Sequence, residues 1–242
     1  MTEAGGQFPE TRWSAIRAAG DPAHPDFRRR FEELGRTYWP PIYAFFRWSR
    51  GYGRDEAQDL TQEFFVQLME GPILERADPS RARFRTYLKT CLANFASKEF
   101  EARGRLKRGG AAKRLSLDFG DEEHEVQVAD ARSPDPVAIV DVEWRRLLVE
   151  RALERLAASL AQRGDVRSAE IFRAHYLVPP GEAQPTYAVL AERFGIPPSP
   201  LVNALYRARK LYRTAILEQI VDSTSTEEEA RLEYRELFGE DP

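Results

Sequence analysis

The sequence predicts an all-α protein in which two small helical domains are joined by a flexible acidic linker, the second domain containing a helix-turn-helix. Apolar residues recur at three- and four-residue intervals over most of the chain, which is the spacing of amphipathic helices. Alternating β-branched residues, which would indicate strands, occur only briefly around residues 126–128. Residues 116–136 combine like charges with prolines, a composition that opposes packing. The 242 residues suffice for two small domains.

Charge alternates in blocks along the chain. Residues 1–114 carry 21 Lys and Arg against 15 Asp and Glu, and residues 144–217 carry 12 against 6. Residues 115–143 carry 1 against 9, and residues 218–242 carry 2 against 9. This mosaic indicates two modules that bind nucleic acid and two acidic segments that do not. Two ordinary solvated domains with a solvated linker would give the same counts.

Composition argues against several other classes of protein. A single cysteine rules out a disulfide framework, and three widely separated histidines argue against a Cys/His metal cluster or a histidine-based triad. No run of 18 apolar residues exists, and residues 1–12 lack an apolar stretch, so we expect no membrane insertion and no secretory signal. The expectation is a cytoplasmic protein with no catalytic residue, no metal ligand and no cofactor.

The first helical domain is expected at residues 27–114, after an N-terminal extension at residues 1–26. An apolar stripe from Phe27 to Phe45 predicts its first helix, with a kink or break at Pro40 and Pro41. Residues 51–53, with two glycines, end that unit, and Asp55 is the expected N-cap of the next helix.

Two further helices are expected in this domain, at residues 56–70 and from Phe84 to about Gly104. The apolar side of the first comprises Ala57, Leu60, Thr61, Phe64, Phe65 and Leu68, and its other side comprises Glu56, Asp59, Gln62, Glu63, Val66 and Glu70. The core side of the second comprises Phe84, Tyr87, Leu88, Cys91, Leu92 and Phe95, and its other side comprises Arg85, Lys89, Ala93 and Ser97.

The second domain is expected at residues 141–217, between a linker at residues 115–140 and an acidic tail at residues 218–242. A helix that begins near Asp141 should end at Gly164, and another should follow around residues 168–177. Thr186 then caps a short helix, and Gly195 should adopt a positive φ at its end.

The last helix of this domain is expected to start at Ser199, as N-cap, with Pro200 at its first position. Its exposed side carries Asn203, Arg207, Arg209, Lys210 and Arg213. A short helix, a glycine turn and a basic second helix have the geometry that enters the major groove of DNA. A plain helical hairpin would show the same pattern.

Taken in order, these elements resemble a bacterial RNA polymerase sigma factor of the extracytoplasmic-function type. Residues 57–65 are similar to the family's helix that grips the polymerase clamp, with the run Asp59-Leu60-Thr61-Gln62-Glu63. Residues 84–88 and Asn94 are similar to the helix that melts and reads the minus-10 element. Residues 190–196 and 205–209 look like the helix-turn-helix for the minus-35 element. The resemblance covers roughly residues 27–108 and 141–217.

This resemblance implies three sets of binding residues and two partners, core RNA polymerase and promoter DNA. The polymerase set is Glu56, Asp59, Gln62 and Glu63. The minus-10 set is Arg85, Tyr87, Lys89, Asn94, Lys98, Arg103 and Arg105. The minus-35 set is Ser199, Asn203, Arg207, Arg209 and Lys210. An anti-sigma factor or a regulatory kinase is a candidate further partner.

The chain departs from the family pattern at several positions. Tyr87 replaces the usual Trp and is as well explained by packing as by base stacking, and Gln58 replaces an acid. Thr61 could restore charge by phosphorylation, but its place on the apolar side favours burial. Val202 and Ala204 stand where the family often has Lys and Arg, so minus-35 readout could depend on DNA shape.

The sequence is compatible with two alternative functions and with several roles of the acidic tail. A helix-turn-helix regulator that acts without polymerase would leave the acidic helix at residues 56–70 unexplained. An enzyme would need a nucleophile or a metal site. Asp59 and Glu63, four residues apart, could bind a metal, but no partner histidine and no phosphate-binding glycine loop supports an enzyme. The acidic tail could shield the basic domains, solubilise the chain, or dock a short helix at residues 231–238.

Overall fold

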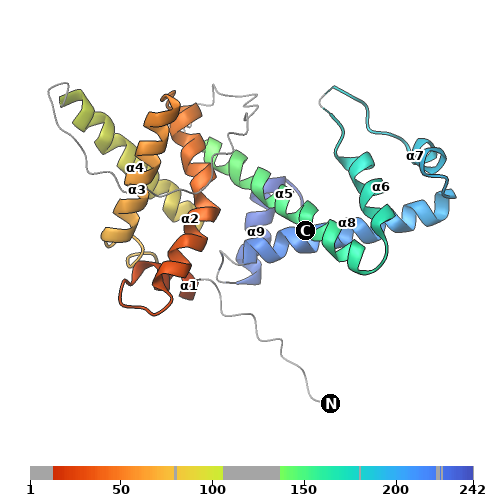
Figure 1. Ribbon diagram of the computed structural model, residues 1–242, viewed down its shortest axis with the longest axis horizontal. Helices are drawn as coiled ribbons and strands as arrows, with labels where there is room; N and C mark the ends of the chain where they lie inside the picture. The colour runs from red at the N-terminus through yellow and green to blue at the C-terminus, as the bar shows by residue number, and fades with distance from the viewer. Residues whose placement is uncertain are drawn as a thin grey trace, which may run out of the picture. The chain divides into compact units, whose positions relative to one another are not determined.

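The structure, a computed structural model, describes residues 13–78, 81–105, 137–179, 181–221, 224 and 226–241. Throughout this part of the chain the regular structure is helical, which confirms the predicted all-α class (Figure 1). The predicted linker lies outside the described residues as far as residue 136. The chain divides into two compact units, Met1–Arg145 with Val221–Glu233, and Arg146–Ile220 with Tyr234–Pro242.

The first unit begins with a helix inside the expected N-terminal extension. This helix, α1 (Trp13–Gly20), buries Ile16, Ala18 and Ala19, and it packs against α2 (Phe27–Ala44). At Gly20 an added Cβ would stand 2.6 Å from the Cβ of Leu74, so glycine permits the close approach of α1 to the loop after α3. No helix is predicted within residues 1–26 from the sequence, so α1 is an additional element.

The sequence predicts a kink or a break at Pro40 and Pro41. A break is wrong, because α2 continues through both residues as far as Ala44. Each proline removes one backbone donor, a cost of about 3 kcal/mol in a helix interior. Burial opposes that cost, since Pro41 and Ile42 are both buried and Ile42 is fully enclosed. A π-helical segment, Phe45–Ser49, follows directly, so the irregularity lies just after the prolines.

The helix α3 (Arg54–Glu70) buries the face that the sequence predicts. Its N-cap is Gly53, whereas Asp55 lies in the first turn, where a negative charge favours the positive end of the helix dipole. Thr61 is fully buried, and its hydroxyl donates a hydrogen bond to the Ala57 carbonyl at 2.7 Å. The buried residues are Ala57, Leu60, Thr61, Phe64, Phe65 and Leu68.

Aromatic contacts join α2, α3 and α4 (Phe84–Arg105) into the core of the first unit. The ring centroids of Phe31 and Phe65 lie 6.2 Å apart in an edge-on contact between α2 and α3. Those of Phe64 and Phe95 lie 5.4 Å apart in a similar contact between α3 and α4. Such pairs add about 0.5–1.5 kcal/mol each beyond the area they bury.

The start of α5 (Ala138–Gln162) also belongs to this first unit. The Trp144 ring stacks on Tyr38 of α2 with a centroid distance of 5.0 Å. Tyr38 in turn contacts Phe84, the first residue of α4, at 5.3 Å. Because Trp144 and Phe84 both contact the Tyr38 ring, the starts of α4 and α5 lie against the same side of α2.

The second unit is built from the rest of α5, α6 (Val166–Tyr176), α7 (Tyr187–Phe194) and most of α8 (Pro198–Val221). The helix α5 ends at Gln162, close to the predicted end at Gly164, and Gly164 has a φ of 71°. The helix α8 begins two residues earlier than predicted, so Ser199 lies inside its first turn and is not the N-cap. One apolar cluster comprises Ile171, Leu190, Leu201 and Leu205.

The acidic tail contains a last helix, α9 (Glu227–Phe238). It extends the predicted helix at residues 231–238 by four residues towards the N-terminus. The helix buries Ala230, Glu233, Tyr234 and Leu237, so this segment packs as a structured element. No described helix is long and apolar enough to cross a membrane.

We predict that Leu205→Ala lowers the free energy of unfolding by about 2–5 kcal/mol, because it leaves a cavity in the cluster beneath α8. The matched control is Val202→Ala on the same helix, an exposed position where the expected change is within about 0.5 kcal/mol. Denaturant unfolding followed by circular dichroism measures both. Equal effects of the two substitutions would contradict the packing of α8.

Candidate functional site

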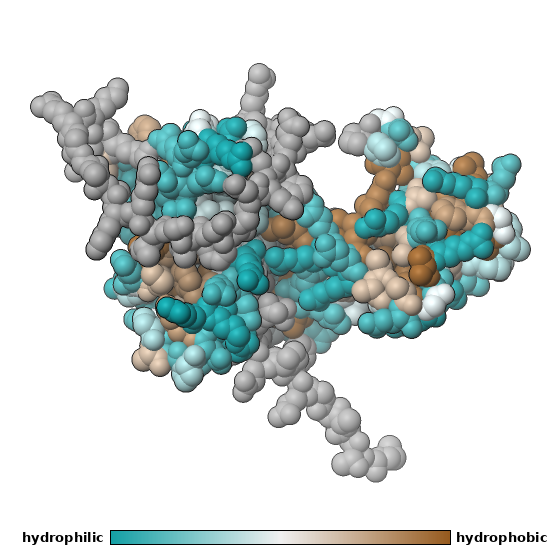
Figure 2. Space-filling view, in the orientation of Figure 1, coloured by the Kyte–Doolittle hydropathy of each residue, from teal (hydrophilic) through white to brown (hydrophobic). Residues whose placement is uncertain are grey.

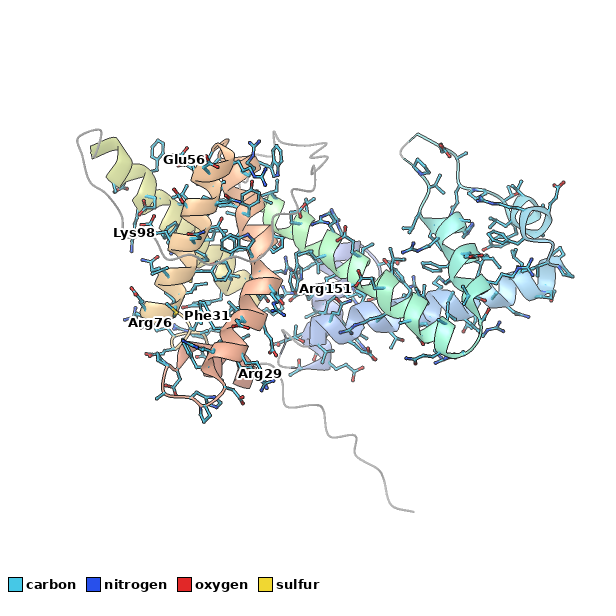
Figure 3. All side chains as sticks on the ribbon, viewed as in Figure 1. Arg29, Phe31, Glu56, Arg76, Lys98 and Arg151 are labelled. Atoms are coloured by element: carbon cyan, nitrogen blue, oxygen red, sulfur yellow. The ribbon has the colours of Figure 1, made fainter. Side chains whose placement is uncertain are left out.

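Three carboxylates form an acidic ridge on α3, namely Glu56, Asp59 and Glu63. All three are exposed, and their spacing of three and four residues places them along one side of the helix. Figure 3 labels Glu56 near the start of α3. Gln62, the fourth predicted member of this set, is only partly exposed. The ridge lies on a helix whose opposite face is fixed in the core, so it presents its charges rigidly.

The predicted minus-10 residues on α4 fall into two groups. Asn94 and Lys98, one turn apart, are exposed on one face, and Figure 3 labels Lys98 there. Tyr87 and Lys89 are partly buried, and Arg85 is 4% exposed. Arg103 and Arg105 lie in the last turn of α4, but their side chains are outside the described set.

The expected exposure of Arg85 is wrong, because two carboxylates enclose its guanidinium group. Its Nε donates to Glu233 Oε1 of α9 at 2.8 Å, and its Nη1 donates to Asp141 Oδ1 in the first turn of α5. Lys89, one turn further along α4, donates to Asp141 Oδ2 at 2.6 Å. We refer to Asp141 and Glu233 as the carboxylate clasp.

The electrostatics of the clasp are those of a buried ion pair. Glu233 is fully buried, and removing a carboxylate from water costs several kcal/mol unless a cation compensates. Burial alone would lower the pKa of Arg85, but the charges of Glu233 and Asp141 outweigh that effect and the pKa is raised. Arg83 Nη1 lies 3.8 Å from Glu233 Oε2 and adds a second positive charge nearby.

Tyr87 is anchored to the loop between α3 and α4. Its hydroxyl donates a hydrogen bond to the Ile73 carbonyl at 2.7 Å. Burial raises the pKa of Tyr87 to about 12. The ring is partly buried, and its polar end holds the loop in place, which favours a packing role over stacking on an unpaired base.

In the second unit, a three-residue turn separates α7 from α8. The Thr186 hydroxyl caps α7 by accepting from the Val189 amide at 3.4 Å, as the sequence predicts. Gly195 has φ 59° and ψ 40°, and the amides of Gly195 and Ile196 donate to Glu192 and Ala191. This is a Schellman cap, which only a residue tolerant of positive φ closes without strain.

All five predicted minus-35 residues lie on the exposed side of α8. Arg207 makes one weak contact, since its Nη2 lies 3.9 Å from Asp165 Oδ2. The predicted minus-35 set does not include Val202 and Tyr206, which lie one turn apart and are 41% and 60% exposed. Their four-residue spacing among polar residues was the available signal. Figure 2 shows hydrophobic patches between hydrophilic ones on the surface of this unit.

Within the described residues, no group of three or more His, Cys, Asp or Glu side chains could hold a metal ion.

We predict that Tyr87→Phe lowers the free energy of unfolding by about 0.5–1.5 kcal/mol near neutral pH, through loss of the hydrogen bond to Ile73. Because the folded-state pKa is raised from 10.0 to about 12, the hydroxyl's contribution is complete below pH 10 and is lost as the pH rises through 12. Denaturant unfolding over that pH range measures it. Tyr206→Phe, at an exposed ring, is the control, and an equal effect there would contradict the anchoring role.

Comparison with protein families matches residues 34–106 to sigma-70 region 2. The matched segment contains all of α3 and α4, and therefore the acidic ridge and the exposed face with Asn94 and Lys98. Comparisons with curated proteins and with solved structures find no match. Residues 34–106 are therefore similar to sigma-70 region 2, and this likeness covers the part of the chain that contains α3 and α4.

Proposed function

We propose that this protein is a sigma factor of the extracytoplasmic-function type, which binds core RNA polymerase and directs initiation by recognising and melting promoter DNA. The region 2 domain supports a role in transcription by RNA polymerase. The observation that carries the finer proposal is that this domain holds an acidic ridge on α3 and an exposed face on α4 with Asn94 and Lys98. Two such surfaces suit two partners, a basic protein surface and DNA.

The acidic ridge is the proposed contact with polymerase. Glu56, Asp59 and Glu63 would meet a basic surface, where complementary charges give steering and register more than raw affinity. The buried face of α3, with Phe64 and Phe65 fully enclosed, keeps the three carboxylates in a fixed arrangement when the partner docks. Thr61 is buried beneath them, so phosphorylation there is not part of the proposal.

The exposed face of α4 is the proposed contact with the minus-10 element. Lys98 supplies a cation for phosphates, and Asn94 supplies hydrogen-bond donors and acceptors for base edges. Arg103 and Arg105 continue the basic sequence to the end of this helix. Single-stranded DNA binds such a groove or face through its backbone, with strong salt dependence.

The exposed side of α8 is the proposed contact with the minus-35 duplex. Asn203 could read adenine, and Arg207, Arg209 and Lys210 could contact phosphates or guanine. Val202 and Tyr206 are apolar on the same side, and the thymine methyl is the apolar group that the major groove presents. We therefore expect thymine within the preferred minus-35 sequence.

A second candidate is a helix-turn-helix regulator that binds duplex DNA without joining polymerase. The exposed basic side of α8 alone favours it. It leaves the acidic ridge without a role, and capture of core RNA polymerase by the tagged protein separates the two candidates.

The test of the proposal is run-off transcription with purified core RNA polymerase and a library of genomic fragments. The expected result is a discrete set of transcripts that requires both the protein and core polymerase. Absence of such transcripts together with absence of core binding would refute the proposal.

We predict that Asp59→Arg with Glu63→Arg weakens binding to core polymerase by about 2 kcal/mol or more, roughly 30-fold, because it reverses the charge of the ridge. The fold should remain, since both positions are exposed. The control is Glu150→Arg with Glu154→Arg on α5, an exposed pair with the same spacing and charge change. Surface plasmon resonance measures the affinities. Wild-type affinity in the ridge variant would contradict the assignment.

We predict that Arg207→Ala and Lys210→Ala each lower the salt slope of duplex promoter binding by about one, as expected for loss of a phosphate contact. Arg163→Ala, an exposed cation outside α8, is the control and should leave the slope unchanged. Uracil in place of thymine should weaken wild-type binding more than it weakens binding by Val202→Ser. Unchanged slopes for both α8 variants would argue that this helix does not lie on DNA.

A further inference from the structure

The cations Arg85 and Lys89 at the start of α4 are held by the chain's own carboxylates. We propose that the carboxylate clasp of Asp141 and Glu233 occupies a site for DNA phosphates, so that the free protein keeps this part of α4 closed until promoter DNA displaces the clasp. The inference rests on the proposed function, because it takes the DNA partner from it. Beyond that function, the inference states that the carboxylate clasp occupies a phosphate site in the first unit and that DNA must displace the clasp.

The chemistry of the site fits a phosphate as well as a carboxylate. A guanidinium group presents its donors in a rigid fork that matches both anions, and a lysine ammonium is a compact partner for either. Arg85 uses Nε towards Glu233 and Nη1 towards Asp141, while Lys89 uses the second oxygen of Asp141. The clasp therefore satisfies the same donors that a phosphate would need.

Charge around the clasp explains why the closed state excludes DNA. The first turn of α9 carries Glu227, Glu228 and Glu229, and Glu233 follows one turn later on the same helix. Residues 218–242 contain 9 acidic against 2 basic side chains. These carboxylates add negative charge on the helix that carries Glu233, and such charge repels a polyanion.

Burial is uneven across the clasp, and this suggests the order of opening. The side chains of Asp141 and Lys89 are 34% and 24% exposed, whereas Glu233 is fully buried. A phosphate can reach Lys89 first and replace Asp141. Glu233 then loses part of the compensation for its burial, which favours its release into water.

The test compares Glu233→Gln with the control Glu228→Gln, which removes the same charge from an exposed position on the same helix. The probe is a fluorescein-labelled single-stranded oligonucleotide of mixed sequence, and anisotropy gives its affinity for the full chain. Glutamine keeps the size of Glu233 and one oxygen that can accept from Arg85 Nε, but it removes the negative charge and leaves Arg85 less well neutralised. We expect tighter binding for Glu233→Gln and little change for Glu228→Gln.

The gain should depend on salt in a defined way. Each additional phosphate contact adds about 0.7 to the salt slope for single strands, so one or two freed cations reduce the variant's advantage roughly three- to sevenfold between about 50 and 200 mM salt. In the double variant Arg85→Gln with Glu233→Gln, the gain in oligonucleotide affinity should disappear, because the cation that would bind the phosphate is absent. An equal gain in Glu228→Gln, its persistence in the double variant, or no gain in Glu233→Gln would overturn the proposal.

Hydrogen exchange on the wild-type chain gives a readout that does not depend on how a variant folds. On addition of the oligonucleotide, amides of α9 around Glu233 should exchange faster while those at the start of α4 become protected. Unchanged or slower exchange in α9 would overturn the clasp. Run-off transcription by the wild-type chain tests the proposed function separately, so active transcription with a clasp that never opens would refute only the inference.

Discussion

A buried guanidinium group needs carboxylates around it, and this requirement organises the first unit. Arg85 is almost fully enclosed, and its partners come from α5 and α9, 56 and 148 residues away along the sequence. The Tyr38 ring fixes the starts of α4 and α5 from the apolar side, through its contacts with Phe84 and Trp144. Polar and apolar contacts thus converge at the start of α4, the helix that carries the predicted minus-10 residues. The stability of this unit and the accessibility of its basic residues depend on the same few side chains.

The helical periodicity of the sequence was sufficient to predict the elements whose burial follows from their own pattern. In α3 the six apolar-side residues are all buried, including Thr61, because a helix with one continuous apolar face has one way to pack. In α7 the caps at Thr186 and Gly195 are local and were predicted correctly. Local periodicity does not predict features that depend on contacts with residues far away in the sequence. Neither the burial of Arg85 nor the helical continuation through Pro40 and Pro41 can be read from local spacing, since tertiary contacts supply the compensation.

The predicted site residues also fall into two groups: those that are exposed as predicted and those that make contacts within the protein. The acidic ridge on α3, the face of α4 with Asn94 and Lys98, and the basic side of α8 are exposed where the sequence places them. Tyr87 instead anchors a loop, and Arg85 and Lys89 serve internal ion pairs. The match to sigma-70 region 2 covers the α3 and α4 surfaces, while the DNA-binding role of α8 rests on its own exposed residues. A surface that a family pattern associates with DNA can therefore be occupied by the chain itself.

Permanganate footprinting tests whether this protein and core polymerase melt promoter DNA. Permanganate oxidises thymines that have left the double helix, so it reports the open complex without a requirement for transcript synthesis. With a promoter that the protein and core polymerase transcribe, we predict reactive thymines around the minus-10 element only when both are present. Asp59→Arg with Glu63→Arg should abolish that reactivity. Thymines that stay unreactive with the wild-type chain and core polymerase would show that the protein does not melt promoter DNA.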